Sequence, residues 1–362
     1  MKFKAKVLFI FIFLHFTLCI SAQEADTVFQ YRGVHLDVSR HFFPKETILK
    51  FIDTISHFKM NYFHWHLTDD QGWRIEIKKY PLLTEIGAWR KEKDGNIYGG
   101  YYTQKEVREI VDYAESKGVT IVPEIDIPGH SSAAIVAYPF LCCNAEPIAV
   151  PNRWGIFKSI VCLSDSNIDF YNNVFDEITT LFPSKYIHIG GDEVPKIEWM
   201  NSDKVDSFKI KHNLKSLSSS QTFFLNAVAL NLIEKGRTPI VWGEALKKGL
   251  DKRIVVMSWR GRSAGIKAAK RGYYNIHASR FYTYFDYPMS VKDKKSAWWM
   301  TYTSPKKVSK FKPIPKRLTD DQKAKTIGIS CTLWTEYISN EEQLWYQLIE
   351  RLRSFSTIRR RL

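Results

Sequence analysis

The stretches TIVPEIDIPGH, residues 120–130, and YIHIGGDE, residues 186–193, decide how the rest of the chain is interpreted. In each, a short apolar, β-branched run ends in glycine together with acids or a histidine. A run of this length and composition predicts a buried strand. The polar residues that follow it predict functional side chains at the carboxyl end of that strand.

Runs of the same kind recur along the chain. The eight predicted strands cover residues 33–38, 62–67, 120–126, 186–190, 239–242, 254–259, 273–277 and 327–333. Stretches with helical period lie between several of them or follow the last, and include residues 44–60, 103–117, 168–182, 221–235 and 341–355. Eight β-α units without an internal repeat or a composition break predict an α/β fold, a single-domain (β/α)8 TIM barrel. A doubly wound parallel sheet is the alternative.

The first residues have the pattern of a secretory signal. Three lysines within the first six residues precede an apolar run at 7–20, and small residues follow it. This run is shorter than the roughly twenty residues that span a bilayer. We therefore expect a signal peptide at 1–22, the (β/α)8 domain at 23–362, no membrane span, and a secreted or periplasmic protein.

Composition narrows the possible partners. The chain has 362 residues, of which 44% are apolar, 25% charged and 14% aromatic, so it is an ordinary globular protein. Its net charge of +15 raises the question of nucleic-acid binding. The charge is spread along the chain, however, and no recognition helix, zinc finger or RNA-binding signature accompanies it. We expect no nucleic-acid partner, and the oligomeric state stays open.

The cysteines after the signal lack the paired spacing of a zinc site. In an oxidising compartment Cys162 pairs with Cys142 or with Cys143, and buried free thiols are the alternative. Cys331 lies within an apolar run and is predicted to be core.

Most predicted strands end in polar residues, often together with tryptophan. These ends are LD at 36–37, HLTDD at 66–70, EIDIPGH at 124–130, GGDE at 190–193, WGE at 242–244, SWR at 258–260 and LWTE at 333–336. Active sites of (β/α)8 barrels lie at the carboxyl ends of the strands. Carboxylates beside indole rings suit a sugar, because the acids perform the chemistry and the rings stack on the apolar face of a pyranose.

In the order and the residues of these segments, the chain resembles the catalytic domain of family 20 glycoside hydrolases, which are β-N-acetylhexosaminidases. The matching segments are RGVHLDVSRHF at 32–42, NYFHWHLTDDQGWRIEIKKYPLL at 61–83, VPEIDIPGHSSAA at 122–134, YIHIGGDEVPK at 186–196, VMSWRG at 256–261, YFDY at 284–287 and LWTEY at 333–337. The likeness runs from about Tyr31 to about Arg351. Two departures stand out: family members often carry a small α+β domain ahead of the barrel, and the lysine-rich segment 292–325 matches poorly.

The resemblance implies a substrate-assisted, retaining hydrolysis of a β-linked N-acetylhexosamine glycan. Glu193 is expected to protonate the leaving oxygen and then to activate water. Asp192 is expected to hold the acetamide N–H and to balance the charge of an oxazolinium intermediate, while Tyr284 aims the acetamide oxygen. No cofactor and no metal ion are implied. If the resemblance were set aside, the acid pair would be interpreted as a helix start.

Further positions of the family's pattern have expected roles. Sugar contacts are expected from Arg32, Trp242, Trp259, Asp286, Trp334 and Glu336. Supporting contacts to the acid are expected from Asp69 and His130, with Asp126 behind His130. Each Trp has a core alternative and Arg32 a structural ion-pair alternative. Trp298 or Trp299 is expected to close the pocket.

Three other functions stay open. His64 and His66 share one face of a strand, as in barrel metallohydrolases, although tightly packed structural histidines are the alternative. A non-catalytic glycan-binding barrel is the second, and the intact acid pair disfavours it. Within the hexosaminidases, a single-barrel dispersin-type enzyme cuts β-1,6-linked polymer internally. The HWHLTDDQGWRIEI tract and the LWTEY ending are more similar to exo-acting enzymes, so we favour exo action.

Overall fold

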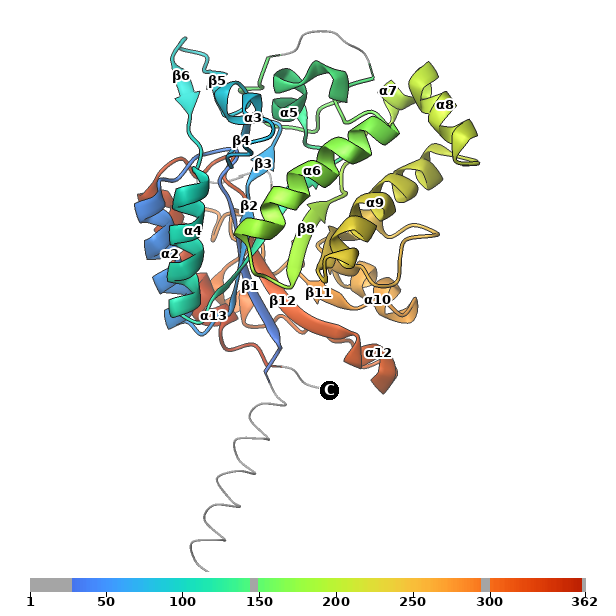
Figure 1. Cartoon of the computed structure of the whole chain (residues 1–362). Coiled ribbons are helices and arrows are strands. Elements are labelled where there is room, and N and C mark those ends of the chain that lie inside the picture. The colour runs from blue at the N-terminus through green and yellow to red at the C-terminus, as the bar shows by residue number, and fades with distance from the viewer. Residues whose placement is uncertain (1–27, 144–148, 294–299, 360–362) are drawn as a thin grey trace, which may run out of the picture.

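Eight parallel strands close into a barrel in the computed structural model, which describes residues 28–143, 149–293 and 300–359 (Figure 1). The strands are β1 (Tyr31–Asp37), β2 (Tyr62–His66), β7 (Thr120–Ile127), β8 (Tyr186–Gly190), β9 (Thr238–Trp242), β10 (Val255–Ser258), β11 (Asn275–His277) and β12 (Thr326–Leu333). Strands follow one another around the barrel in chain order, and β1 pairs with both β2 and β12. The predicted (β/α)8 barrel is confirmed, and the doubly wound sheet is wrong.

Long helices cover the outside of the barrel. They are α2 (Lys45–His57), α4 (Gln104–Ser116), α6 (Asp165–Leu181), α9 (Leu217–Glu234), α10 (Arg262–Lys270) and α13 (Glu341–Phe355). Side chains that accept a backbone N–H begin four of them: Thr103, Ser164, Ser216 and Asn340. These four helices therefore start at a defined residue, and each buries apolar side chains.

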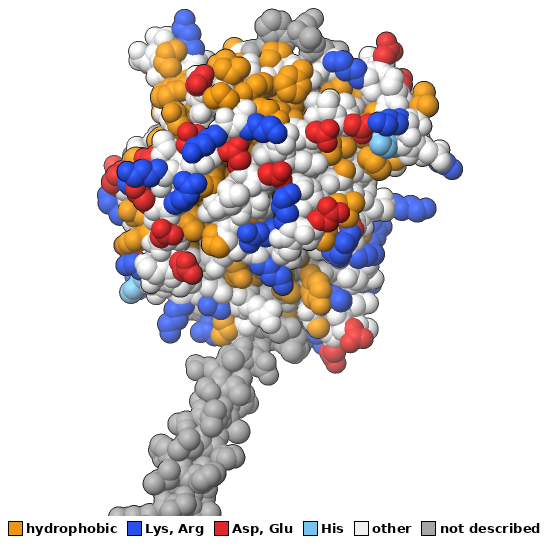
Figure 2. Space-filling model, viewed as in Figure 1, with side chains coloured by type: hydrophobic (Ala, Val, Ile, Leu, Met, Phe, Trp, Pro, Cys, Tyr) orange, Lys and Arg blue, Asp and Glu red, His pale blue; other side chains and the backbone are white. Residues whose placement is uncertain are grey.

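Short elements lie mainly in the connections. The short helices are α3 (Leu82–Glu85), α5 (Ser132–Ala137), α7 (Ile197–Met200), α8 (Asp203–Lys211), α11 (Pro305–Val308) and α12 (Asp320–Ala324). Two hairpins, β3 (Thr68–Asp69) with β4 (Gly72–Trp73) and β5 (Trp89–Lys91) with β6 (Ile97–Gly99), follow β2. Figure 2 shows apolar side chains over the end of the molecule that holds α3 and α5, where Ile86, Trp89 and Phe140 are exposed.

The interior of the barrel is layered, because alternate residues of each strand point inward. The layer at the amino ends of the strands is tyrosine, with Tyr31, Tyr62 and Tyr186 in ring contact. The next layer holds imidazoles and an indole, His35, His64, His188 and Trp242, around the carboxylate of Glu124. Polar side chains thus fill the barrel beneath its carboxyl end.

A disulfide joins Cys143 to Cys162, which settles the choice between Cys142 and Cys143. Cys331 is buried in the core, as predicted. The expected signal peptide, residues 1–22, lies outside the described residues. Among the helices that the structure describes, none is long and apolar enough to cross a bilayer.

Candidate active site

The carboxyl end of β8 places two acids at the mouth of the barrel. Gly190 and Gly191 both have positive φ, +67° and +102°, and turn the chain sharply after the strand. A Cβ on Gly190 would lie 1.6 Å from Asp126 Oδ1, so this turn requires glycine. Glu193 also has a positive φ, +41°, which is uncommon for a residue with a side chain. The turn holds Asp192 buried and leaves a quarter of the Glu193 side chain exposed.

Asp192 is buried beside other ionisable groups. Burial, together with the Glu193 charge, raises the pKa of Asp192 to about 7, and His130 opposes this rise. Its Oδ1 has no hydrogen-bond partner among the described residues. Polar atoms of Asp126, His130 and Asp192 lie within 4.8 Å of one another, and burial followed by the Asp192 charge raises the pKa of Asp126. A buried carboxylate oxygen is thus available to a donor from a ligand.

Glu193 faces a histidine that carboxylates hold in place. His130 Nε2 lies 3.8 Å from Glu193 Oε2, and His130 Nδ1 lies 3.1 Å from Asp69 Oδ1 and 3.2 Å from Asp70 Oδ2. Burial opposes a charge on His130, but Asp69 raises its pKa well above the ordinary value. The structure therefore brings Asp69, Asp126 and His130 together with the acid pair, and His130 presents a positive charge to Glu193.

A second acidic group consists of Asp286, in the segment after β11, and Glu336, after β12. Asp286 is 9% exposed and its Oδ1 has no hydrogen-bond partner in the described chain. Burial, and then the neighbouring Glu336, raises the pKa of Asp286 well above its ordinary value. Burial also raises the pKa of Glu336, which Arg40 opposes. The Arg40 guanidinium lies 5.2 Å from the ring centroid of Trp334.

Aromatic side chains line the space between these two acidic groups. Ring centroids are 6.2 Å apart for Trp259 and Tyr284, 6.4 Å for Tyr284 and Trp334, and 5.8 Å for Trp242 and Trp334. Burial raises the pKa of Tyr284, so its phenol keeps a proton to donate. The Trp259 indole N–H has no partner among the described residues, whereas that of Trp242 donates to Glu124 at 2.7 Å. Trp242 therefore forms the floor of the site.

Arg32 is not part of this cluster, and its expected contact with a sugar is wrong. It is the second residue of β1, at the amino end of the barrel, and lies on the outward-facing side of the strand between Tyr31 and Gly33. Its side chain donates to the carbonyls of Lys59 and Phe29. Strand polarity thus separates Arg32 by the length of β1 from the acids.

The arginine of the site is Arg40, which was not predicted from the sequence. It lies 2.8 Å from Asp69 Oδ2 and 3.3 Å from Asp37 Oδ2, and is buried. The segment RGVHLDVSRHF contains both arginines, and only Arg40 follows the strand's carboxyl end, which is the signal that distinguishes them. Glu244 was also missed; it pairs with Arg260 at 2.7 Å, and burial raises its pKa.

Two other expectations concern neighbouring residues. Trp298 and Trp299 lie outside the described residues. His64 and His66, considered as metal ligands, face inward beneath the acid pair. Each has a ring nitrogen within 2.8 Å of the Glu124 carboxylate. These imidazoles therefore have a structural partner in the barrel interior.

Comparison with known proteins matches this arrangement. The family model for the glycosyl hydrolase family 20 catalytic domain covers residues 29–358. A β-hexosaminidase of Porphyromonas gingivalis is 40% identical over 329 residues, which are 90% of this chain and 42% of that protein. A β-hexosaminidase of Vibrio furnissii is 35% identical, over 90% of this chain and 55% of its own length. The chain thus spans about half the length of these relatives.

Solved structures give the same result. The exo-β-N-acetylglucosaminidase of Vibrio harveyi, solved with N-acetylglucosamine, has a TM-score of 0.84 at 33% identity, over 91% of this chain and 54% of that one. A β-N-acetylhexosaminidase of Bacteroides fragilis has a TM-score of 0.80 at 36% identity, over 91% and 66%. Family match, barrel and acid pair agree: the chain belongs to glycosyl hydrolase family 20.

Proposed function

We propose that this chain is a β-N-acetylhexosaminidase that removes terminal β-linked N-acetylhexosamine from the non-reducing end of glycans. The observation that carries the proposal is the pairing of a partly exposed acid, Glu193, with a buried neighbour, Asp192, whose Oδ1 lacks a protein donor. The names of the relatives support the same substrate class.

In the proposed reaction the sugar's own acetamide oxygen attacks the anomeric carbon while Glu193 protonates the leaving oxygen. Glu193 suits this role because it reaches solvent and therefore both the leaving group and the incoming water. After the aglycone departs, Glu193 accepts a proton from that water, which opens the oxazolinium ring and restores the β configuration.

Asp192 is proposed to accept the acetamide N–H. Its pKa of about 7 leaves the free carboxyl near balance between its two forms at neutral pH. A positive oxazolinium ring beside it favours the ionised form, so the stabilisation grows as the charge develops. Tyr284, a buried phenol that keeps its proton, is proposed to donate to the acetamide oxygen.

Exo action is proposed because the charged groups at one end of the site are enough to bind all free hydroxyls of a single terminal sugar. Arg40, Asp286 and Glu336 offer a donor and two acceptors beside Trp334. These groups suit the free hydroxyls of a terminal sugar, because an unpaired buried polar group costs roughly 1–3 kcal/mol. A sugar already extended through those hydroxyls loses these bonds.

A labelled β-linked N-acetylglucosamine pentamer tests the direction of cleavage. We expect free monosaccharide from the earliest times, and no cleavage when O3 or O4 of the terminal sugar is capped. Dimers and trimers as the first products, or full activity on the capped chain, would contradict exo action and favour the endo alternative. A thiazoline mimic of the cyclised sugar should inhibit strongly, and β-glucosides without the acetamide should be nearly inert.

Replacement of the acid tests the proposed chemistry. Glu193→Gln should bind substrate normally and lower kcat on unactivated disaccharides by roughly 10²–10⁴-fold, because the leaving oxygen is no longer protonated. A substrate with a very acidic leaving group should lose less in the glycosylation step. A variant that keeps half of its activity on the disaccharide would refute the assignment.

Export is proposed from the signal-like segment at 1–22 and supported by the Cys143–Cys162 disulfide, since such bonds persist in oxidising compartments. Fractionation of producing cells and sequencing of the mature amino terminus test it. A protein that retains residue 1 and stays with the cytosolic fraction would contradict export.

A further inference from the structure

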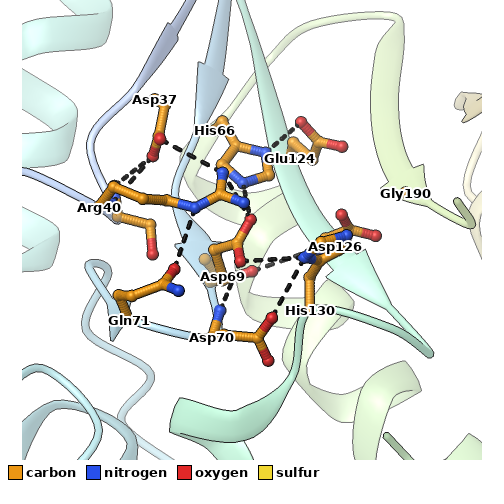
Figure 3. A network of polar contacts seen from close by, with 12 residues as sticks. Asp37, Arg40, His66, Asp69, Asp70, Gln71, Glu124, Asp126, His130 and Gly190 are labelled. Atoms are coloured by element: carbon orange, nitrogen blue, oxygen red, sulfur yellow. Dashed lines mark hydrogen bonds and ion pairs between the residues drawn. The ribbon is translucent and has the colours of Figure 1, made fainter. Parts of the chain in front are cut away.

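The contacts of Glu193 continue far into the barrel. His130 joins Glu193 to Asp69. Figure 3 shows the part of the series from His130 through Asp69 to His66, in which Asp69 Oδ2 lies 2.9 Å from His66 Nε2. On its other side, His66 Nδ1 lies 2.6 Å from Glu124 Oε2. Asp69, His66 and Glu124 are each 1% exposed or less. A continuous series of charged groups therefore connects the proposed acid to the centre of the barrel.

His66 binds a carboxylate through each ring nitrogen, and only a protonated imidazolium donates from both. Burial opposes this charge, but Glu124 and Asp69 outweigh it and raise the pKa of His66 well above the ordinary value. His66 is thus a fixed positive charge on the side of Asp69 that faces away from His130.

Glu124 is placed to hold that charge. Its Oε2 lies 2.8 Å from His64 Nε2 as well as 2.6 Å from His66. Its Oε1 accepts a hydrogen bond from Trp242 and lies 2.8 Å from His188 Nδ1. Burial opposes the ionised form, but these histidines hold the pKa of Glu124 below its ordinary value. Contacts from three other strands therefore fix both oxygens of an ionised carboxylate.

We propose that His66 and Glu124 are positioning residues for the hydrolysis: Glu124 fixes the His66 imidazolium, which shares Asp69 with His130 and sets the pH at which Glu193 releases its proton. The inference rests on the proposed role of Glu193 as the acid. Neither residue contacts the acid itself, and both act through Asp69 and His130.

Other charged or titratable groups surround this series. Around His66 and Asp69 these are His35 and Asp37 on β1, Arg40 after β1, His64 on β2, Asp70 between β3 and β4, Asp126 on β7, His188 on β8 and Glu336 after β12. Around Glu193 they are Asp192, Glu244 and Tyr287. Arg40 still pairs with Asp69 when His66 is replaced, so replacement removes one charge and leaves Asp69 ionised.

The sign of the effect follows from charge. Glu193 must be protonated to act as an acid, so its pKa sets the basic limb of the pH profile of kcat/KM. Loss of the His66 charge makes the surroundings of Glu193 less positive, which favours the protonated form of the acid. His66→Gln should therefore move the basic limb to higher pH by roughly 0.5–1 unit.

His35→Gln is the matched control. His35 lies in the same barrel interior with its ring 5.5 Å from His66, is buried, and has no hydrogen-bond partner on either nitrogen within the described chain. Burial keeps the pKa of His35 low, so it carries no charge to remove. A profile of His35→Gln that superimposes on the wild type, beside a shifted His66→Gln, supports the proposal. An unshifted His66→Gln, or equal shifts in both variants, overturns it.

If His66→Gln does not fold, imidazole nitrogen NMR of the wild-type protein at mildly alkaline pH tests whether His66 is protonated on both ring nitrogens. We expect His66 to carry protons on both nitrogens, with the Nδ1 proton shifted downfield by Glu124. A His66 that is neutral or lacks the Nδ1 proton overturns the proposal. An active Glu193→Gln variant would instead refute the proposed function, and the protonation state of His66 is measured independently of it.

Discussion

At the scale of single residues, the site depends on a few buried charges whose partners differ. Arg40 and Arg32 belong to one sequence segment but lie at opposite ends of β1, and only Arg40 reaches Asp69. Asp192 and Glu193 are adjacent in sequence, yet one is buried without a partner on Oδ1 and the other reaches solvent. Side chains of the same or similar type therefore differ in burial and in bonding partners, and these differences determine which of them can act in the site.

Substitution of Arg40 and substitution of Arg32 should affect kcat/KM differently. Arg40→Ala removes a buried charge from the proposed sugar site and should lower kcat/KM by roughly 10²–10³-fold, equivalent to about 3–4 kcal/mol. Arg40→Lys keeps the charge and should recover part of the loss. Arg32→Ala should leave kcat/KM unchanged and cost some stability, since it loses contacts to backbone carbonyls. Steady-state kinetics of the three variants check this, and a large loss with Arg32→Ala would restore its original assignment.

The raised pKa of Asp192 predicts a gain in stability when it is replaced. An acid whose pKa is higher folded than unfolded destabilises the folded state as pH rises from about 4 to about 7, and the cost is complete above that. Asp192→Asn should therefore raise the free energy of unfolding at pH 8 by about 2–4 kcal/mol and change it little at pH 4. Urea unfolding at both pH values measures this. An equal change in the free energy of unfolding at the two pH values would show that ionisation of Asp192 does not destabilise the folded protein. We expect kcat of Asp192→Asn to fall whatever its effect on stability.

At the scale of elements, strands and long helices were predictable because their periods extend over many residues. The eight strands and the helices α2, α4, α6, α9 and α13 were predicted within a few residues of their observed bounds, whereas no range was given for α10. The start of α9 was placed late because residues 217–220 are mostly serine, and the Ser216 cap begins the helix earlier. The hairpins β3–β4 and β5–β6 were missed, since strands of two or three residues carry no measurable alternation.

The sharp turn after β8 is the element on which the site depends most. Gly190→Ala should lower both stability and kcat, because its Cβ would collide with Asp126 and displace the acid pair. Gly236→Ala is the matched control: Gly236 also has a positive φ, +74°, but nothing lies within 4 Å of its Cβ. The control should lose about 1–2 kcal/mol from backbone strain and keep its kcat. Similar kinetics for the two variants would show that the glycine turn does not position the acids.

At the scale of the whole molecule, the parallel barrel brings distant residues to one end. The expected site residues on β7 and β9 and in the loops after β2, β7, β8, β10, β11 and β12 meet there, which could be predicted once the eight strands were counted. Side-chain pairing across the barrel, such as Glu124 with His66 and Trp242, could not be predicted, since spacing along the chain does not give the stagger of neighbouring strands. The same limit left the partner of Cys162 open until the loop geometry selected Cys143.

The central claim is that the substrate's own acetamide oxygen is the nucleophile. The most direct test compares kcat/KM for aryl β-N-acetylglucosaminides whose acetyl group carries none, one, two or three fluorines, because each fluorine withdraws electrons from that oxygen. We expect a steep, regular decrease in kcat/KM, of roughly 10²-fold or more over the series. Rates that do not depend on fluorination, together with a trapped sugar ester on a carboxylate, would contradict it.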